Sequence, residues 1–293
     1  MNHCQIITHH LRFHVVEAGF EGPNQTDKPL VLLLHGFPEC WYAWRHQIPL
    51  LAEYFRVVAP DLRGYNLSEK PTEVSAYRLN YLVEDVLALA DYYGAEQFYL
   101  VGHDWGAMIA WATALLHPER VVKLAALQVP HPQCWLEHMR GAQLQASWYI
   151  TAFQVPILPE LMISLDNYCF VEQAFLHTST KRGTISKADI QVFKEACAQP
   201  GALTAGINYY RANLGLDNPL QQFQDPVKVP TLFIYGEKDF AILPETVKDL
   251  KKYVDSPYEE VRLPDCGHWV QQEAPETVNQ VLIAFLRKRS NLS

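Results

Sequence analysis

The residues best placed to do chemistry lie in the segment GHDWG, residues 102–106. It follows a short apolar run, 98–101, and precedes a stretch, 107–117, that is typical of a helix. A strand, a sharp turn between two glycines and a helix form a nucleophile elbow, which holds one side chain above the edge of a sheet. Here that side chain is Asp104, where serine is usual. The alternative is that Asp104 only caps the helix, because aspartate is a favourable N-cap residue.

Asp239 and His268 complete a possible catalytic set. Each follows a predicted strand late in the chain, so the order nucleophile, acid, base is that of the α/β hydrolases. Either residue alone could be an ordinary turn or helix-entry residue, but three such residues in order at strand ends favour the catalytic interpretation. The strand that ends near Leu127 is followed by no carboxylate, so Asp239 is the expected orienting acid. Asp265, close to His268, is interpreted as a capping residue.

The segment HGFP, 35–38, directly follows the apolar run 30–34. In α/β hydrolases this loop supplies one backbone N–H group of the oxyanion hole, and the residue after the nucleophile supplies the other. We therefore expect the N–H groups of Phe37 and Trp105 to form the hole. A simple glycine–proline turn that ends a strand is the alternative.

An aspartate nucleophile points to a saturated carbon as its target. A serine that attacked such a carbon would form an ether that water cannot release, whereas Asp104 would form an alkyl ester. Water activated by His268 and Asp239 could then attack the carbonyl carbon of that ester. Epoxides and carbon–halogen bonds are the two common electrophiles of this kind.

The two electrophiles differ in their leaving group. A halide leaves as an ion and needs N–H donors, whereas an opened epoxide leaves an alkoxide that needs a proton donor such as tyrosine. Tyr149 and Tyr210 lie in the helical part of the chain and are the candidates. The alternative, that both are ordinary core or surface residues, is strong because the chain has 15 tyrosines and most must be of this kind.

Several further residues are assigned by type and neighbourhood. His103 is expected to be structural, because adjacent residues of an elbow point in different directions. Glu39 could lie behind the oxyanion hole or be a solvated turn residue. An apolar substrate pocket is expected, with core packing as the alternative for most of its residues, which are Phe37, Pro38, Trp105, Phe153 and Trp269.

No metal or other cofactor is expected. Histidines gather near the N-terminus, but no Cys, Asp or Glu stands beside them at ligand spacing, and they are interpreted as surface or strand residues; they are His3, His9, His10 and His14.

The apolar runs alternate with helical patterns, which predicts a parallel sheet. Between residues 131 and 223 the pattern is helical and rich in aromatic residues. We therefore expect an α/β core made of residues 1–130 and 224–293, interrupted by a helical cap over 131–223 at the edge of the sheet where α/β ligand sites lie. The expected strands are 11–18, 30–34, 56–59, 98–101, 121–127, 231–235 and 259–263, and the expected helices of the core are 77–93, 107–117, 244–253 and 275–289.

Composition excludes several classes of protein. The chain has 293 residues, 49% of them hydrophobic, and a net charge of −8 without a Lys/Arg-rich run, so a nucleic-acid partner is not expected. No apolar run is long enough to cross a membrane, and the N-terminus lacks the pattern of a signal peptide. The six cysteines are scattered without a CxxC motif, which favours free thiols in the reducing cytoplasm.

The chain resembles the soluble epoxide hydrolases of the α/β-hydrolase fold over nearly its full length. The resemblance implies that Asp104 is the nucleophile, His268 the base and Asp239 its partner, and that Tyr149 and Tyr210 hold and protonate the epoxide oxygen. Asn66 stands where the family often has glycine, which affects a turn rather than the chemistry. The matching segments are HGFPECWYAWR (35–45), DLRGY (61–65), GHDWG (102–106), Tyr149 with Phe153 and Gln154, NYYR (208–211), EKD (237–239) and CGHW (266–269).

Rival activities call for residues that the chain lacks at three positions. Haloalkane dehalogenases usually carry asparagine where this chain has Phe37. Fluoroacetate dehalogenases carry arginine where it has Trp105 and Met108. The resulting prediction is hydrolysis of a small apolar epoxide by water, without nucleic-acid or membrane partners and in an oligomeric state that the sequence does not determine. A dehalogenase and a non-catalytic receptor that binds an apolar ligand are the alternatives.

Overall fold

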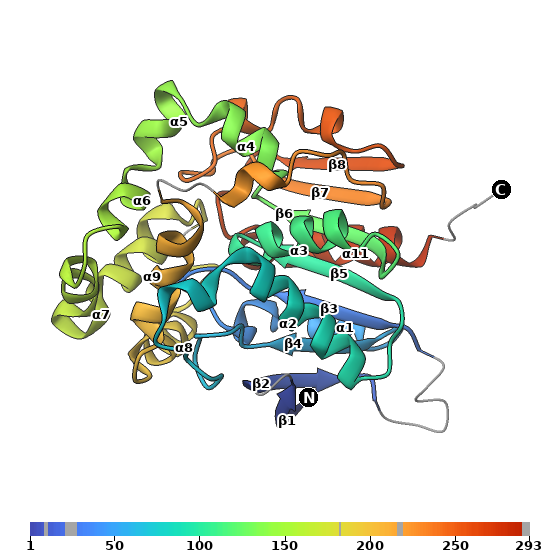
Figure 1. The fold of residues 1–293 in the computed structure, drawn as a ribbon, viewed down its shortest axis with the longest axis horizontal. Helices are drawn as coiled ribbons and strands as arrows, with labels where there is room; N and C mark the ends of the chain where they lie inside the picture. The colour runs from blue at the N-terminus through green and yellow to red at the C-terminus, as the bar shows by residue number, and fades with distance from the viewer. Residues whose placement is uncertain (9–10, 21–27, 182, 216–218, 289–293) are drawn as a thin grey trace.

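The computed structural model describes residues 1–8, 11–20, 28–181, 183–215 and 219–288. They build an eight-stranded sheet in the order β1-β2-β4-β3-β5-β6-β7-β8 (Figure 1). The pairs β1–β2 and β2–β4 are antiparallel, and β3 to β8 run parallel to one another. This is the α/β-hydrolase fold that the sequence predicts. The strands are β1 (Asn2–Thr8), β2 (Leu11–Ala18), β3 (Leu30–Leu34), β4 (Arg56–Pro60), β5 (Phe98–His103), β6 (Val121–Leu127), β7 (Thr231–Gly236) and β8 (Tyr258–Leu263).

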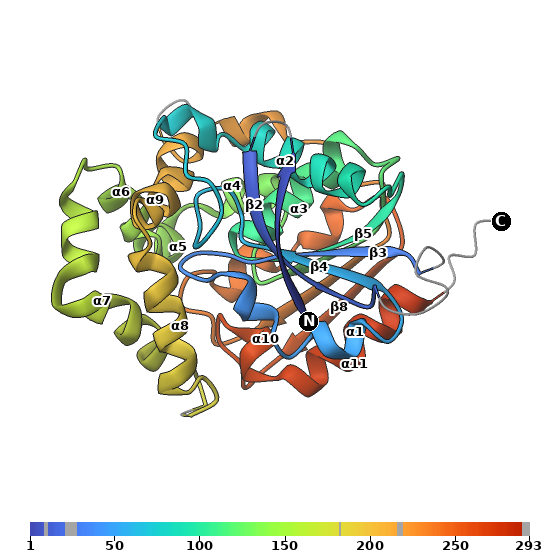
Figure 2. The same cartoon turned by 90° about the horizontal axis from the view of Figure 1, so that it is seen from below.

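The central strands read as apolar runs because helices cover both faces of the sheet. All five residues of β3 are buried, as are all six of β7. Figure 2 shows α2 (Leu79–Tyr92) and α3 (Trp105–Leu116) on one face, with α1 (Ile48–Leu51) and α11 (Pro275–Arg287) on the other. The packing between α3 and the strands holds the start of that helix in place.

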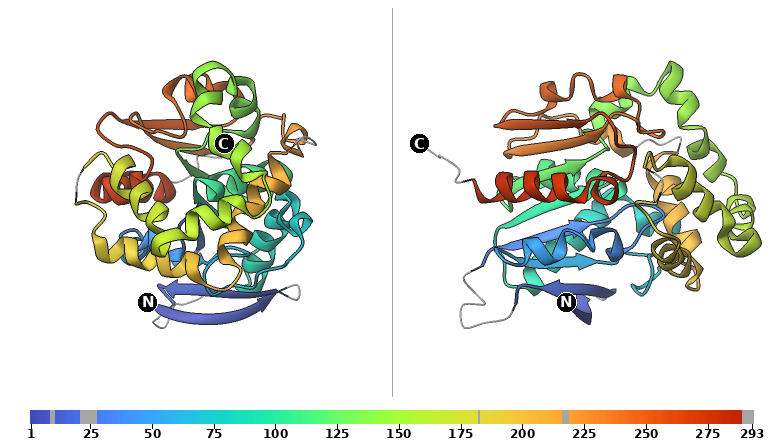
Figure 3. Two further views of the ribbon diagram at one scale, coloured as in Figure 1. Left: turned by 90° about the vertical axis from the view of Figure 1, so that its left-hand side faces the viewer. Right: turned by 180° about the vertical axis from the view of Figure 1, so that it is seen from behind.

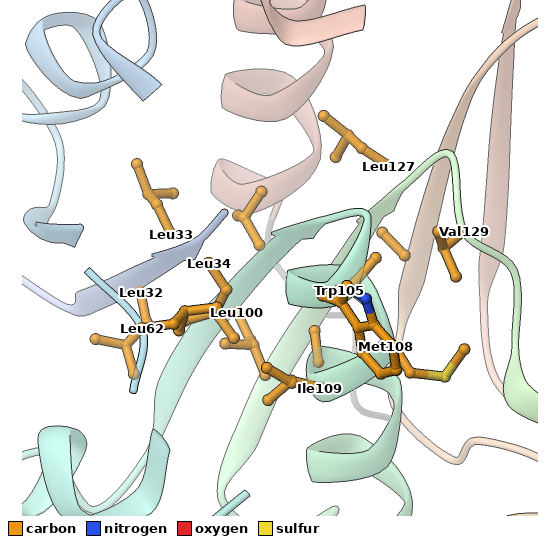
Figure 4. Close-up of a cluster of buried hydrophobic side chains, with 14 of the residues drawn as sticks. Leu32, Leu33, Leu34, Leu62, Leu100, Trp105, Met108, Ile109, Leu127 and Val129 are labelled. Carbon is orange, nitrogen blue, oxygen red and sulfur yellow. The ribbon is translucent and has the colours of Figure 1, made fainter. Parts of the chain in front are cut away.

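Apolar side chains make up most of the core under the start of α3. Ten of the twelve residues of α3, from Trp105 to Ala114, are buried. Figure 4 shows Leu32, Leu34 and Leu100 from the strands gathered near Ile109 of α3. Burying a large aliphatic side chain contributes about 1.5–3 kcal/mol, so this contact fixes the strand-to-helix turn between β5 and α3 firmly.

The segment between β6 and β7 is helical. Its helices lie together at one end of the sheet (Figure 1), and Figure 3 shows them from their outer side and from behind. We call them the α4–α9 layer. Its elements are α4 (Pro132–His138), α5 (Gly141–Ala146), α6 (Trp148–Phe153), α7 (Leu158–Thr178), α8 (Lys187–Ala198), α9 (Ala202–Asn213) and the 3-10 turn η3 (Pro219–Gln222). The core carries η1 (Trp41–Trp44), η2 (Val74–Tyr77) and α10 (Val270–Glu273) besides.

Two features differ from the sequence expectations. Strand β1 was not anticipated, because it is an edge strand on which only Ile6 and Thr8 are buried. The helix expected over 244–253 is wrong: η4 (Pro244–Val247) and η5 (Leu250–Tyr253) are separate 3-10 turns. Asp249 between them has a φ of −110° and a ψ of 18°, which interrupts the helical path.

Some expectations concern residues at the limits of the described chain. Helix α11 ends at Arg287, and Arg289, where its end was expected, lies outside the described residues, as do His9 and His10.

Asn66 has a φ of +42°, a conformation that asparagine tolerates better than most residues. Its side-chain amide donates to Asp61 Oδ2 at 2.8 Å, which stabilises the turn in which the family often has glycine.

Candidate active site

Asp104 stands on a strained turn between β5 and α3. Its φ is +53° and its ψ −121°, which is unfavourable for a non-glycine residue. A Cβ atom on Gly102 would approach Gly106 O to 2.2 Å, and one on Gly106 would approach Leu34 O to 2.1 Å, so both positions of the elbow require glycine. The Asp104 side chain makes no capping hydrogen bond to α3. The alternative that Asp104 only caps the helix is therefore wrong.

The loop after β3 holds one carboxylate oxygen of Asp104. The Phe37 N–H donates to Asp104 Oδ1 over 2.8 Å. This approach requires Gly36, because a Cβ atom there would lie 2.4 Å from the same oxygen. The peptide bond between Phe37 and Pro38 is cis. Trp105, the other residue predicted to supply a backbone N–H group, is the first residue of α3, and the role of its N–H group stays a prediction.

His268 lies between the two carboxylates that the sequence singles out. Its Nε2 atom is 3.5 Å from Asp104 Oδ2, and its Nδ1 atom is 2.8 Å from Asp239 Oδ2. Asp239 Oδ1 accepts from the N–H groups of Ala241, at 2.7 Å, and Ile242, at 3.1 Å. A carboxylate that is held by two backbone donors fixes the direction of its second oxygen, and therefore the orientation of the imidazole.

Opposite charges at the site favour a protonated His268 and an ionised Asp104. Burial acts to lower the pKa of His268, but the neighbouring carboxylates of Asp239 and Asp104 outweigh it and raise the pKa well above its ordinary value. Burial acts to raise the pKa of Asp104, but nearby His268, with His103 and the Phe37 N–H group, lowers it. Asp104 is therefore ionised at neutral pH, as a carboxylate nucleophile must be.

Gln128 is a site residue that the sequence did not reveal. It follows β6 with a φ of +68°, and its side chain is buried. Its amide nitrogen donates to Asp239 Oδ2 at 2.6 Å and to Gly267 O at 2.9 Å, while its amide oxygen accepts from the Gly236 N–H group at 2.6 Å. Gln128 thus joins the ends of β6 and β7 to the loop that carries His268. A glutamine after a strand carries no sequence signal of its own, because the orienting residue of this fold is a carboxylate.

Behind the imidazole, His103 and Glu39 form a buried pair. His103 Nδ1 lies 2.8 Å from Glu39 Oε2, and His103 Nε2 lies 2.8 Å from the backbone oxygen of His268. Of the two expectations for Glu39, the solvated turn residue is wrong, because Glu39 is 1% exposed. Asp265 is not a helix cap either: its exposed carboxylate pairs with Lys238 at 3.0 Å.

Two cavities meet at Asp104. The larger, of about 140 Å³, is lined mainly by apolar side chains and includes four of the five residues predicted to line the pocket, namely Phe37, Pro38, Phe153 and Trp269. The smaller, of about 40 Å³, is lined by Trp105, the fifth, with Met108, Val129 and Trp135 among others. Figure 4 shows Trp105, Met108 and Val129 near one another at the start of α3.

Tyr149 of α6 and Tyr210 of α9 line both cavities together with Asp104. Their rings meet edge to face, with centroids 5.9 Å apart, and both rings pack against Phe153. Burial, followed by the negative charge of Asp104, raises the pKa of each hydroxyl. Both tyrosines therefore keep their protons at neutral pH.

A model of the α/β hydrolase fold matches residues 29–275. Epoxide hydrolase 4 of Mus musculus is 39% identical over 286 residues, which are 96% of this chain and 77% of that protein. Epoxide hydrolase A of Mycobacterium tuberculosis is 33% identical and covers 95% of both chains. The solved structure of Bacillus megaterium epoxide hydrolase with an inhibitor superimposes with a TM-score of 0.86 at 31% identity, covering 97% of this chain and all of that one. This chain belongs to the epoxide hydrolase family of the α/β-hydrolase fold.

Membership of the epoxide hydrolase family identifies the protein as a hydrolase and agrees with the resemblance stated from its sequence. Within the part of the chain that the structure describes, no cluster of three or more His, Cys, Asp or Glu side chains could hold a metal ion. The described helices include none that combines the length and apolar character needed to span a bilayer.

Proposed function

We propose that this protein opens epoxides to vicinal diols through an ester on Asp104. The observation that carries the proposal is the meeting of three groups in one place: a carboxylate on an elbow and two protonated tyrosines line the same apolar cavities. A carboxylate nucleophile suits a saturated carbon, and the tyrosines suit a leaving group that must gain a proton.

In the first step, Asp104 attacks one carbon of the epoxide ring. Oδ1 is held by the Phe37 N–H group, so Oδ2 is the attacking oxygen and Oδ1 becomes the carbonyl oxygen of the ester. The bond between that carbon and the ring oxygen breaks, and its electron pair stays on oxygen. Tyr149 and Tyr210 donate hydrogen bonds to this oxygen, and one of them gives it a proton.

In the second step, water attacks the carbonyl carbon of the ester. His268 takes a proton from the water as the bond forms, and the Phe37 and Trp105 N–H groups stabilise the negative charge that develops on Oδ1. The tetrahedral intermediate collapses, and the bond from the carbonyl carbon to the diol oxygen breaks. The diol oxygen takes the remaining proton of the attacking water, so the diol leaves neutral and the carboxylate of Asp104 is restored. The proton on His268 then returns through solvent to the tyrosinate that the first step left. Asp239 stabilises the charged imidazole meanwhile.

The ester itself prepares His268 for the second step. In the free enzyme the carboxylates of both Asp239 and Asp104 raise the pKa of His268. The ester is neutral, so one of these two charges is lost once Asp104 has reacted. The pKa of His268 then falls, which favours the neutral imidazole that general-base catalysis requires.

The α4–α9 layer acts as a cap in this scheme. It places Tyr149 and Tyr210 opposite Asp104 and lines one side of the apolar cavities. In this proposal the core comprises residues 1–130 and 224–293, and the cap comprises residues 131–223. The substrate is a small apolar epoxide, because Asp104 and His268 are the only Asp, Glu, Lys, Arg or His residues among the described residues that line the larger cavity.

Oxygen-isotope labelling tests the proposal. The enzyme in excess over styrene oxide, in water enriched in ¹⁸O, should give a first-turnover diol whose new oxygen is unlabelled, because that oxygen comes from Asp104. Repeated turnover should then place ¹⁸O in the peptide that contains Asp104. A first-turnover diol that takes its new oxygen from the solvent would exclude the ester. Parallel incubations with a haloalkane and a haloacid that release halide, while styrene oxide stays intact, would support a dehalogenase, and no turnover of any of them would support a receptor.

A further inference from the structure

We propose that Glu273 is a positioning residue that holds the loop of His268 and links it to the α4–α9 layer. This inference rests on the proposed function, because it assigns a partner to the proposed base. Glu273 is the last residue of α10 and is 3% exposed. It makes no contact with Asp104 or Asp239 among the described hydrogen bonds, and nothing in its sequence context distinguishes it from an ordinary helical glutamate.

The Glu273 carboxylate receives the N–H groups on both sides of His268. Its Oε2 atom accepts from the Gly267 N–H group, and its Oε1 atom accepts from the Trp269 N–H group, each at 3.1 Å. Gly267 is needed for this arrangement, because a Cβ atom there would lie 3.1 Å from Glu273 Oε1 and 2.8 Å from the backbone oxygen of Thr178. The main chain at His268 is therefore clamped before and after the imidazole.

The same carboxylate reaches the connection between α7 and α8. Thr180 donates to Glu273 Oε2 through its N–H group, at 2.9 Å. Its hydroxyl group also contacts this oxygen and shares its one proton with the backbone oxygen of Asp265, 2.7 Å away. Close by, the indole N–H of Trp269 donates to the hydroxyl of Thr178 at 2.9 Å. A movement of this end of the α4–α9 layer would therefore pull on the loop of His268 directly.

Three backbone N–H groups and a shared hydroxyl group converge on Glu273 with no acceptor among them, and this explains the residue type. A carboxylate offers two oxygens that only accept, whereas an amide would turn its NH₂ group toward an N–H donor. Hydrogen bonds to an ionised group are roughly twice as strong as neutral ones, so the four bonds can hold the charge in a buried place. Glu273→Gln keeps the volume of the side chain but cannot keep all four bonds.

Loss of the clamp should affect the two steps of the reaction unequally. Asp104 is held by the elbow and by the Phe37 N–H group, neither of which contacts Glu273, so ester formation should persist. His268 would lose its fixed position between Asp104 and Asp239. Because a misplacement of about 1 Å can cost 10²-fold in rate, ester hydrolysis in Glu273→Gln should fall by about ten- to a hundredfold.

The pH dependence should separate positioning from general loss of stability. The rate of ester hydrolysis rises with pH as His268 loses its proton. An imidazole that moves away from Asp239 loses the charge that raises its pKa, so the rise should begin at lower pH in Glu273→Gln. A purely structural role would lower the melting temperature and leave this midpoint unchanged in the folded enzyme.

The test compares the wild type, Glu273→Gln, Glu273→Asp and Asp189→Asn in single-turnover reactions with styrene oxide, in which ester formation and ester hydrolysis are timed separately. Asp189 is the matched control: it joins α8 to Tyr42 and Arg45 of the core and makes no hydrogen bond to residues 266–269 among the described contacts, so its loss loosens the layer while the clamp on the loop of His268 stays intact. Ester hydrolysis should slow in Glu273→Gln, recover in part in Glu273→Asp and stay near the wild-type rate in Asp189→Asn.

A readout without substrate keeps this test separate from that of the proposed function. The Nδ1 proton of His268, hydrogen-bonded to Asp239, should give a far-downfield NMR signal in the free wild-type enzyme, and the signal should shift or broaden in Glu273→Gln. If Glu273→Gln is too unstable, Glu273→Asp decides by the same measurements, since its shorter side chain cannot reach all four donors. An unchanged signal with an unchanged midpoint would overturn the inference, whereas a wild type that forms no ester would overturn only the proposed mechanism.

Discussion

At the scale of single residues, His268 does its work only in the second step of the proposed reaction. His268→Gln removes the base and leaves Asp104, the Phe37 N–H group and both tyrosines in place. We expect the variant to react once with styrene oxide and then to stop, because water is no longer activated. Intact-protein mass spectrometry should show an added mass equal to that of the epoxide. A variant that turns over normally and carries no added mass would remove His268 from the mechanism.

Asp239→Asn should change both the rate and the pH dependence of ester hydrolysis. Asparagine cannot stabilise the charged imidazole, and it turns a donor or a weaker acceptor toward His268, so the maximal rate should fall by about 10²-fold or more. The charge of Asp239 also raises the pKa of His268. Without it that pKa falls, neutral imidazole persists to lower pH, and the rise in rate should move to lower pH. Single-turnover hydrolysis rates across pH measure both effects, and a midpoint that moves upward would contradict the assignment.

The residues that sequence could identify and those that it missed differ in how their roles arise. Asp104 could be singled out because the residues that form its turn are adjacent in the sequence: two glycines flank it between a strand and a helix. The fold class, which is confirmed, was predictable for the same reason, because apolar runs and the glycines that end them are local features of the sequence. Gln128 and Glu273 were missed because neither type is unusual where it stands. Gln128 gains its role only when β6 and β7 pair and bring it to Asp239, 111 positions away.

At the scale of elements, the loop after β3 and the elbow after β5 form one unit around Asp104. Gly36→Ala would place a methyl group 2.4 Å from Asp104 Oδ1 and must displace either the carboxylate or the Phe37 N–H group. We expect ester formation to fall by about 10²-fold or more, with the fold retained, because the displacement is local to the reacting atoms. Stopped-flow measurement of ester formation checks this, with circular dichroism as the test of folding.

Gly94→Ala is the matched control for that variant. Gly94 ends α2 with a φ of +67°, and a Cβ atom there meets nothing within 4 Å. Its replacement should lower the free energy of unfolding by about 1 kcal/mol through backbone strain alone, without changing the rate per folded molecule. If Gly36→Ala behaves like Gly94→Ala, the close approach of the two loops has no part in holding Asp104.

At the scale of the whole molecule, the candidate site forms where the α4–α9 layer meets the α/β core. Asp104, Asp239 and His268 come from the ends of strands or the loops after them, whereas Tyr149 and Tyr210 come from α6 and α9. Tyr210 is further built into the interface, since its ring packs edge to face on Trp105 and on Phe37 of the core. In the proposed reaction the α4–α9 layer thus supplies the proton donors, and the core supplies the nucleophile and the base.

This division predicts that the double variant Tyr149→Phe, Tyr210→Phe loses the first step and keeps the second. Either hydroxyl alone can still donate to the epoxide oxygen, so each single variant should slow ester formation by less than the double variant does. Loss of a general acid typically costs about 10²–10⁴-fold in rate, and the double variant should therefore form almost no ester. The packing should survive, because each substitution removes only one oxygen.

Quenching of tryptophan fluorescence, with Trp105 at the site, reports ester formation, and mass spectrometry of trapped enzyme confirms it. Hydrolysis of an ester made from an activated epoxide should proceed near the wild-type rate. A double variant that opens styrene oxide at the normal rate would show that neither tyrosine is the proton donor for the alkoxide.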